Sequence, residues 1–277
     1  MDNKKYRVLF FDSGIGGLSV YQETMKHNDI IPSYLFDNLH FPYGIQPDDV
    51  VIETVVKLLK NFTERYLTDL IVIACNTAST VALQYVRENV RIPVVGVVPA
   101  VKPAAQISVN KVIGLLATPA TVRRPYIMEL IDRFASDCMV LKIGSSELVE
   151  IAERKMMGLP YDRKIIGQVL REWCEGNLVP DTVVLGCTHF PHLRKEIQEV
   201  LPYAKLIDSG DAIARRVGYL LKELQNNHIP SVEMENSDNI ITLNEAVAFC
   251  TDASKITSCL QQGFSGFGFK RVEVFKV

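Results

Sequence analysis

The stretch LIVIACNTAST, residues 70–80, decides the fold. It opens with a continuous apolar run, which is typical of a strand buried on both faces of a sheet. A cysteine and two polar residues follow at once, and then a helix-like pattern begins. The stretch TVVLGCTHFPHL, residues 182–193, repeats this order with Cys187 in the place of Cys75. The sequence therefore twice places a thiol between a buried strand and a helix.

Similar apolar runs alternate along the chain with longer segments of helical period, such as 48–66 and 121–135. Parallel strands covered by helices show this alternation, so the sequence predicts an α/β protein with mainly parallel sheets. Residues 226–239 are polar and lack a period, which predicts an exposed connector, and a short helix–strand unit is expected after them. The predicted strands are 7–11, 33–37, 70–74, 93–97, 112–117, 139–143, 182–186 and 205–208.

Two short repeats favour a chain built from two similar halves. The tripeptide DSG occurs at 12–14 and again at 208–210, and a cysteine followed by two polar residues occurs at 75–77 and 187–189. A tripeptide can recur by chance, so the DSG repeat alone is weak support for duplication, and the cysteine repeat strengthens it. The prolines in VPAVKPAAQ, residues 98–106, mark a crossing between the two domains.

Composition narrows the partners and the compartment. The chain has 277 residues, 48% of them hydrophobic, and a formal net charge of −2, with no basic stripe that would bind a nucleic acid. No apolar run is long enough for a signal peptide or a membrane span, so we expect a cytoplasmic protein with no membrane partner. Free thiols are then the expected state of the cysteines, and four are interpreted as ordinary buried apolar residues: Cys138, Cys174, Cys250 and Cys259.

Polar residues that could bind a ligand or take part in catalysis follow the predicted strands. Ligands of parallel α/β sheets bind at the carboxyl ends of strands, and a thiolate just before a helix is stabilised by the helix dipole. The loop DSGIGG could cradle an anion, but a dinucleotide fingerprint would need glycine where Ser19 stands. The residues in question are Asp12 with Ser13, Asp37 with FPYG at 41–44, Cys75 to Thr77, Thr118 with Thr121, Cys187 to His189, and Asp208 with Ser209.

Metal and cofactor sites are not expected. Cys187, His189 and His192 lack the further paired ligands that zinc needs. Residues i and i+2 leaving a strand point to opposite faces, so no direct pairing of Cys187 with His189 is expected. Lys142 is the one lysine placed for a pyridoxal phosphate enzyme, but that chemistry would not explain two cysteines.

Two thiols at matching positions suit one reaction well. If both reach the same substrate carbon from opposite faces, a thiolate removes a proton while a thiol on the other side donates one, and the stereocentre inverts. The thiols exchange roles in the reverse reaction. The pattern therefore favours a cofactor-independent racemase or epimerase.

At this point the chain resembles the cofactor-independent glutamate racemases of the aspartate/glutamate racemase family, isomerases that make D-glutamate for bacterial cell-wall peptidoglycan. The resemblance covers most of the chain, from about residue 7 to 225. It implies two α/β domains related by a pseudo-two-fold axis, with the active site in the interdomain cleft. The expected domains are 1–98 plus 210–277, and 99–209. The resemblance rests on FFDSGIGGLSV, FDNLHFPYG, ACNTAS, GVVPA, GLLATPATV and LGCTHFPHL, in that order.

The resemblance also implies roles for residues. Cys75 would deprotonate D-glutamate and Cys187 would deprotonate L-glutamate, with Asp12 and His189 assisting the two thiols. No cofactor and no metal are implied. The residues similar to the family's substrate-binding residues are Asp12, Ser13, Pro42, Tyr43, Gly44, Asn76, Thr77, Thr118, Thr121, Thr188 and His189.

One segment departs from many relatives. Where they carry a sequence like CPLFVPLVE, this chain has CMVLKIGSSELVEIAE, which leaves open which of Glu147, Glu150 and Glu153 belongs to the site. Some relatives with the second kind of segment depend on a cell-wall precursor as activator and carry a longer N-terminal extension. Only a few residues precede the first strand here, which argues against that dependence. A homodimer is common in the family.

Other functions stay open at this stage. Aspartate and hydantoin racemases share the two-cysteine logic, although His189 after Cys187-Thr188 favours glutamate because aspartate enzymes usually carry glutamate there. From a different class, a non-catalytic amino-acid-binding module would use the cysteines only as core residues. Such a module would bind a ligand without exchanging its α-proton.

Overall fold

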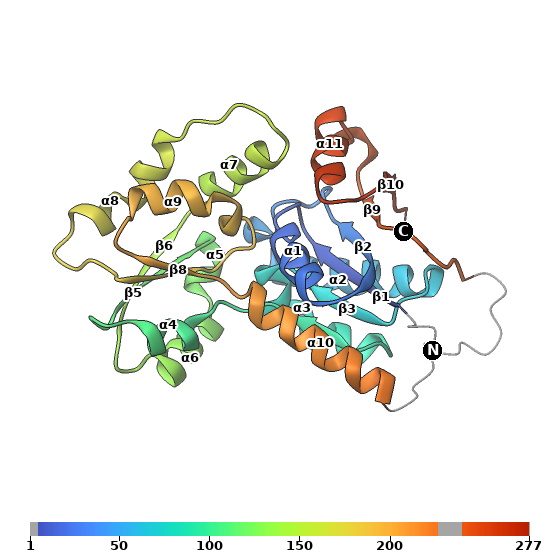
Figure 1. The fold of residues 1–277 in the computed structure, drawn as a ribbon, viewed down its shortest axis with the longest axis horizontal. Coiled ribbons are helices and arrows are strands. Elements are labelled where there is room, and N and C mark those ends of the chain that lie inside the picture. Colours follow the sequence, from blue (N-terminus) through green and yellow to red (C-terminus); the bar gives the residue numbers. More distant parts are fainter. Residues whose placement is uncertain (1–4, 227–239, 277) are drawn as a thin grey trace. The chain divides into compact units, whose positions relative to one another are not determined.

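The computed structural model describes residues 5–226 and 240–276, so the predicted connector lies outside the described residues except for Asn226. The chain divides into two compact units, Met1–Val97 with Gly210–Val277, and Val98–Ser209. Each unit is built on one parallel sheet with helices packed against it (Figure 1). The predicted α/β class with parallel sheets is confirmed. In the described part of the chain, no helix combines the length and apolarity that crossing a membrane requires.

The first unit holds a six-stranded sheet in the order β10-β9-β2-β1-β3-β4, with every pair parallel. Its strands are β1 (Tyr6–Asp12), β2 (Ile30–Phe36), β3 (Leu70–Ile73), β4 (Val94–Gly96), β9 (Val247–Cys250) and β10 (Val272–Val274). Its helices are α1 (Leu18–His27), η1 (Tyr43–Ile45), α2 (Asp48–Arg65), α3 (Asn76–Asn89), α10 (Gly210–Asn226), η3 (Ala253–Lys255) and α11 (Ser258–Gly266).

Alternating side chains of the strands build the core of this unit on both faces of the sheet. Leu9 and Phe11 of β1 belong to a buried cluster with Val55 and Phe62 of α2. On β1, Phe10 lies between them and packs edge-on against Tyr21 of α1, with ring centroids 5.4 Å apart. Successive strand residues point to opposite faces, so continuous apolarity is the sequence signature of this two-sided burial.

The end of the chain differs from the expected helix–strand unit, because β9 precedes α11 and makes it a strand–helix–strand unit. β9 has four residues, all buried, and includes an alanine and a cysteine. Val247 and Phe249 favour a strand, but Ala248 does not, and a run of four residues is too short to predict one. Parallel pairing with β2, from Ser33 opposite Val247 to Phe36 opposite Cys250, forms the strand. Only long-range pairing could reveal it.

The second unit holds a four-stranded parallel sheet in the order β6-β5-β7-β8. Helices α4 and α6 lie on one side of it and α7, α8 and α9 on the other (Figure 1). Its strands are β5 (Val112–Ala117), β6 (Met139–Gly144), β7 (Thr182–Leu185) and β8 (Lys205–Ile207). Its helices are α4 (Val101–Ile107), α5 (Pro119–Arg123), α6 (Pro125–Phe134), α7 (Glu147–Met156), α8 (Lys164–Glu175), η2 (Phe190–Leu193) and α9 (Arg194–Val200).

The two sheets share one winding. In the first unit β1 lies between β2 and β3, and in the second β5 lies between β6 and β7. The chain therefore leaves the central strand to one side and then crosses to the other side. At such a topological switch point the loops diverge and leave a crevice at the carboxyl ends of the strands. Cys75 follows β3 and Cys187 follows β7, so both thiols lie at this point of their own unit.

The DSG repeat does not share this equivalence. Residues 12–14 follow the first strand of their unit, whereas residues 208–210 follow β8, the fourth strand of the other. Its use as a sign of duplication was therefore wrong, and the repeat that follows the winding is the cysteine one.

Candidate active site

One candidate cluster lies at the switch point of the first unit. Asp12 is the last residue of β1, and Cys75 is the N-cap residue of α3, with an extended backbone at φ −125°. The Oγ of Ser13 lies 3.9 Å from the Sγ of Cys75. Both side chains are almost fully buried. The N-terminus of a fourteen-residue helix carries a partial positive charge, which favours the thiolate form of a cysteine at this place.

The glycine-rich loop after β1 holds the Asp12 carboxylate. Its Oδ1 accepts a hydrogen bond from the Ser13 N–H at 2.7 Å, and its Oδ2 accepts one from the Gly17 N–H at 2.6 Å. A Cβ at position 17 would lie 2.7 Å from the hydroxyl of Tyr34 and 2.9 Å from the Cβ of Ala74. Glycine is therefore required for this close approach. Two N–H groups of the loop thus bind the protein's own carboxylate, which fixes Asp12 at the end of β1.

Asn76 and Thr77 form the first turn of α3 directly after Cys75, and both are buried. The Oδ1 of Asn76 is buried and accepts no hydrogen bond from any described residue. An unsatisfied buried acceptor costs about 1–3 kcal/mol, so this atom is suited to accept a hydrogen bond from a ligand. An ammonium group would supply such a donor.

The predicted substrate loop lies after β2 and contains η1. Pro42 and Gly44 are half-buried, and Tyr43 between them is buried in the same apolar cluster as Cys75. The Tyr43 hydroxyl donates to Oδ2 of Asp37 at 2.8 Å. Burial, with the Asp37 charge and hydrogen bond added, raises the pKa of Tyr43 well above its ordinary value. Tyr43 therefore stays protonated and keeps this hydrogen bond.

A second candidate cluster lies at the switch point of the other unit. Thr118 follows β5 and caps α5, its Oγ1 accepting from the Thr121 N–H at 3.3 Å. The two threonine hydroxyls are 2.8 Å apart. Thr188 is buried beside Cys187, which is itself 7% exposed. Each cluster thus combines one buried cysteine with neighbouring hydroxyl groups.

Cys187 and His189 pair directly, which contradicts the sequence-based expectation. The Sγ of Cys187 lies 3.6 Å from Nδ1 of His189, and Nε2 of His189 lies 2.7 Å from Oε1 of Glu153. The strand alternation used in the prediction ends at Leu185. Beyond it the chain turns, with the Phe190 N–H donating to the Cys187 carbonyl at 3.1 Å, and this turn brings residues i and i+2 to one side.

Electrostatics hold His189 in its charged form. Its complete burial alone would lower the pKa, but hydrogen bonds to Cys187 and Glu153, and their negative charges, outweigh burial and keep the pKa of His189 well above its ordinary value. An imidazolium at this distance stabilises negative charge on the sulfur. Cys187, His189 and Glu153 together can therefore let Cys187 act as a base in one direction of a proton transfer and as an acid in the other.

The sequence left open which of three glutamates belongs to the site, and the structure brings Glu153 to His189. Glu147 and Glu150 lie on the same helix α7 but are exposed, whereas Glu153 is half-buried and reaches His189. Their spacing of three residues gave no way to choose between them. Packing of α7 against η2, which carries the chain on from His189, makes the choice.

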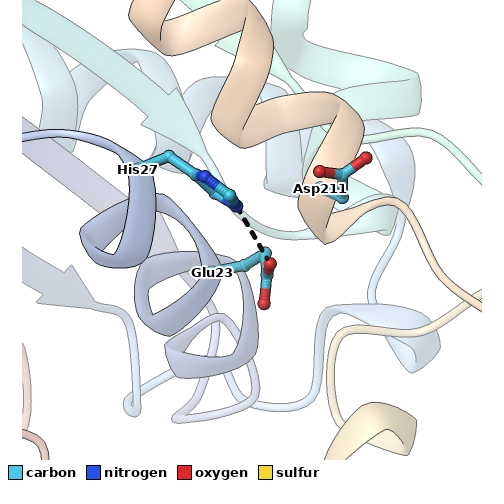
Figure 2. A group of neighbouring side chains, drawn as sticks. All are labelled: Glu23, His27 and Asp211. Atoms are coloured by element: carbon cyan, nitrogen blue, oxygen red, sulfur yellow. Dashed lines mark ion pairs between the residues drawn. The ribbon is translucent and has the colours of Figure 1, made fainter.

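One group of side chains has ligand types that metals use, and none of its members is a predicted site residue. Figure 2 shows Glu23 and His27 of α1 near Asp211 of α10, with their ligand atoms within 4.8 Å of one another. Lys26 binds Glu23 at 2.6 Å and Arg215 binds Asp211 at 2.8 Å. Both carboxylates are therefore already neutralised, and Asp211 lies in the first turn of α10, whose dipole disfavours a cation. Local ion pairing accounts for this group.

The other cysteines differ in burial. Cys250 is buried, and burial raises its pKa to about 11, so it is an inert thiol. Cys138 and Cys259 are half-buried, while Cys174 is exposed. The interpretation of Cys174 as a core residue was therefore wrong. It lies near the end of α8, where a sequence pattern alone did not show which face meets solvent.

Known proteins resemble this chain over nearly all of its length. The family model described as Asp/Glu/Hydantoin racemase matches residues 20–217. The glutamate racemase of Klebsiella pneumoniae is 47% identical over 271 residues, covering 96% of this chain and 90% of that protein. The glutamate racemase of Pectobacterium atrosepticum is 52% identical over 221 residues, covering 79% and 78%.

A solved structure is similar as well. The Escherichia coli glutamate racemase in complex with L-glutamate and the activator UDP-MurNAc-Ala superposes with a TM-score of 0.89. It is 43% identical in sequence, and the match covers 99% of both chains.

Proposed function

This chain belongs to the Asp/Glu/Hydantoin racemase family, and on that premise we propose that it interconverts L- and D-glutamate without a cofactor. The similarity to glutamate racemases over 96% of the chain supports the choice of glutamate. One structural observation carries the chemistry. In each unit a buried cysteine follows the third strand at the switch point, with polar groups beside it.

The proposed reaction is a two-base proton transfer at the α-carbon. The thiolate of Cys75 removes the α-proton of D-glutamate while the Cys187 thiol donates a proton to the opposite face, giving L-glutamate. The product leaves Cys75 as thiol and Cys187 as thiolate, ready for the reverse reaction, so protons and charge balance. Two-base chemistry requires both thiols to reach the same carbon of one substrate molecule.

Surrounding polar groups support the charges of the substrate. Glutamate carries two carboxylates and an ammonium, and negative charge builds toward its α-carboxylate as the proton leaves. Fixed hydroxyl and N–H donors stabilise such charge in a water-poor site. We assign this role to the side chains of Ser13, Thr77, Thr118, Thr121 and Thr188, which are all buried.

A substitution at Asn76 should weaken substrate binding without lowering the stability of the fold. Asn76→Ala removes an acceptor that has no partner among the described residues, so it should raise the KM for glutamate roughly tenfold without lowering the Tm. Steady-state kinetics and thermal unfolding measure the two effects. Asn89→Ala, at the exposed end of the same helix, is the matched control and should change neither. A lower Tm with an unchanged KM would make Asn76 a structural residue.

Isotope exchange tests the function itself. The protein, freed of metal and pyridoxal phosphate, is incubated with L-glutamate in D₂O, and optical rotation and deuterium at Cα are followed, with L-aspartate alongside. We expect glutamate alone to racemise, with deuterium entering the inverted product. Racemisation of aspartate instead would show that the chain acts on a different substrate of the same family. Binding without exchange would indicate an amino-acid-binding module.

The biological setting follows from the same proposal. D-glutamate is a component of peptidoglycan, so we place the reaction in the cytoplasm at the supply of this precursor. The similar Escherichia coli enzyme was solved with the activator UDP-MurNAc-Ala. The match to that enzyme over 99% of both chains outweighs the earlier argument against an activator. The exchange assay therefore includes an arm with this compound, and we expect it to raise the rate.

A further inference from the structure

A buried carboxylate that the proposed reaction does not use lies at the end of β2. Asp37 is fully buried, and polar groups surround both of its oxygens. Oδ1 accepts a hydrogen bond from the Thr251 hydroxyl at 2.6 Å. Oδ2 accepts one from the Tyr43 hydroxyl at 2.8 Å and lies 2.8 Å from Nδ1 of His40. A buried charge is tolerated only with such partners, so the positions of these donors are closely fixed.

The next residue makes a second set of bonds to the same distant segment. Oδ1 of Asn38 accepts from the N–H groups of Thr251 and Asp252, at 3.1 and 2.8 Å, and its Nδ2 donates to the Asp252 carbonyl at 3.1 Å. The Leu39 N–H donates in turn to the Thr251 hydroxyl at 3.1 Å. Residues separated by more than 200 positions are thus joined at the start of the substrate loop. We call Asp37, Asn38, Thr251 and Asp252 the loop anchor.

Packing on one side of the loop anchor is open. A cavity of about 630 Å³ lies against Asp37, His40 and Thr251, with Lys57 and Phe275 among its other lining residues. Side chains that face a cavity gain little from dispersion contacts on that side. On this side the hydrogen bonds of the loop anchor, rather than apolar packing, hold the substrate loop in place. On its other side the ring of Tyr43 packs in the cluster that contains Cys75.

We infer that Asp37 is a positioning residue, which ties the substrate loop 41–45 to the C-terminal segment through Thr251 and thereby sets Tyr43 beside Cys75. Asp37 acts through Tyr43 and needs no contact with the substrate. The kinetic consequence rests on the proposed racemase function, whereas the consequence for the loop does not. The C-terminal segment β9–η3 then serves the site although it carries none of the predicted site residues.

Two variants test the inference, each with a matched control. Asp37→Asn replaces an acceptor oxygen by an amide that faces donors, and Thr251→Val removes one hydroxyl at nearly constant shape. Asp69→Asn is the control for the first, because Asp69 is a buried carboxylate at the amino end of β3 that accepts from the Arg7 N–H at 2.7 Å. Thr63→Val is the control for the second, because its hydroxyl bonds only within α2.

Hydrogen exchange of residues 38–46, followed by mass spectrometry, reads out the loop without any activity. We expect exchange roughly tenfold faster in Asp37→Asn and Thr251→Val, and unchanged in both controls. Kinetics read out the site. The KM for glutamate should rise roughly tenfold in both variants with a smaller change in kcat. Both substitutions remove the hydrogen bond between Thr251 and Asp37, so their effects in the double variant should be less than additive.

The outcomes separate the two proposals. Wild-type exchange and wild-type KM in Thr251→Val would overturn the loop anchor, as would effects of the two substitutions that simply add. Equal acceleration of exchange in Asp69→Asn would also overturn it, since the effect would then be general loss of stability. If neither the wild type nor any variant racemises glutamate, the proposed function is wrong. The hydrogen-exchange data on residues 38–46 still decide the inference about the loop anchor.

Discussion

Alanine at position 75 or at position 187 is expected to abolish racemisation, with a fall in kcat/KM on the order of 10³-fold or more. Each thiol is the sole acid or base on its face of the substrate in the proposed reaction. Each is also buried at the switch point of its unit, with 6% of Cys75 and 7% of Cys187 exposed, so water cannot readily replace it. Optical rotation of L- and D-glutamate measures the loss.

The loss must be equal in both directions. Enantiomers have the same free energy in water, so the equilibrium constant is one and kcat/KM for the two substrates must fall together. Proton exchange is more informative. In D₂O, any residual exchange in Cys75→Ala should be confined to L-glutamate, and in Cys187→Ala to D-glutamate, because one base remains on one face.

Cys138→Ala is the control for these two variants. This cysteine is half-buried and its Sγ donates to Asp137 at 3.5 Å, away from all predicted site residues in the sequence. It should keep nearly full activity. Near-full activity in either Cys75→Ala or Cys187→Ala would refute the two-base mechanism, and residual exchange of the opposite enantiomer would reverse the assignment of the two thiols.

Replacement of His189 by asparagine is expected to lower kcat/KM on the order of 10²-fold. The substitution removes the imidazolium that lies 3.6 Å from the sulfur of Cys187, and with it the group that stabilises negative charge there. Asparagine keeps a polar side chain but cannot carry the charge. An unchanged kcat/KM would make the pair a structural contact only.

The partner carboxylate gives this prediction a pH signature. Glu153 helps to raise the pKa of His189, so in the wild type the imidazole keeps its proton through neutral pH and loses it only as the pH rises past the raised value. Glu153→Gln removes that charge, and the pKa of His189 falls. The alkaline limb of the kcat/KM profile should therefore move to lower pH. Glu150→Gln, exposed on the same helix, should leave the profile unchanged.

The sequence by itself determined the class of fold and the place of Cys75 and Cys187 at the ends of strands. Continuous apolar runs such as 70–74, bounded by polar residues and alternating with segments of helical period, favour strands covered on both faces by helices. A cysteine directly after such a strand must lie at the carboxyl edge, where ligands of these sheets bind. Local pattern was sufficient to place Cys75 and Cys187 at the ends of strands, because strand and helix periods can be recognised within a few residues.

Tertiary structure alone decided which side chains support those thiols. Glu153 meets His189 across 36 residues, and Asp37 meets Thr251 across 214, so no local pattern could select them. β9, with only four residues, is defined by its parallel pairing with β2. The pairing of Cys187 with His189 depended on the point where β7 ends and the chain turns. Burial and long-range hydrogen bonds are properties of the packed chain, and they set the charge and the position of each group in the candidate site.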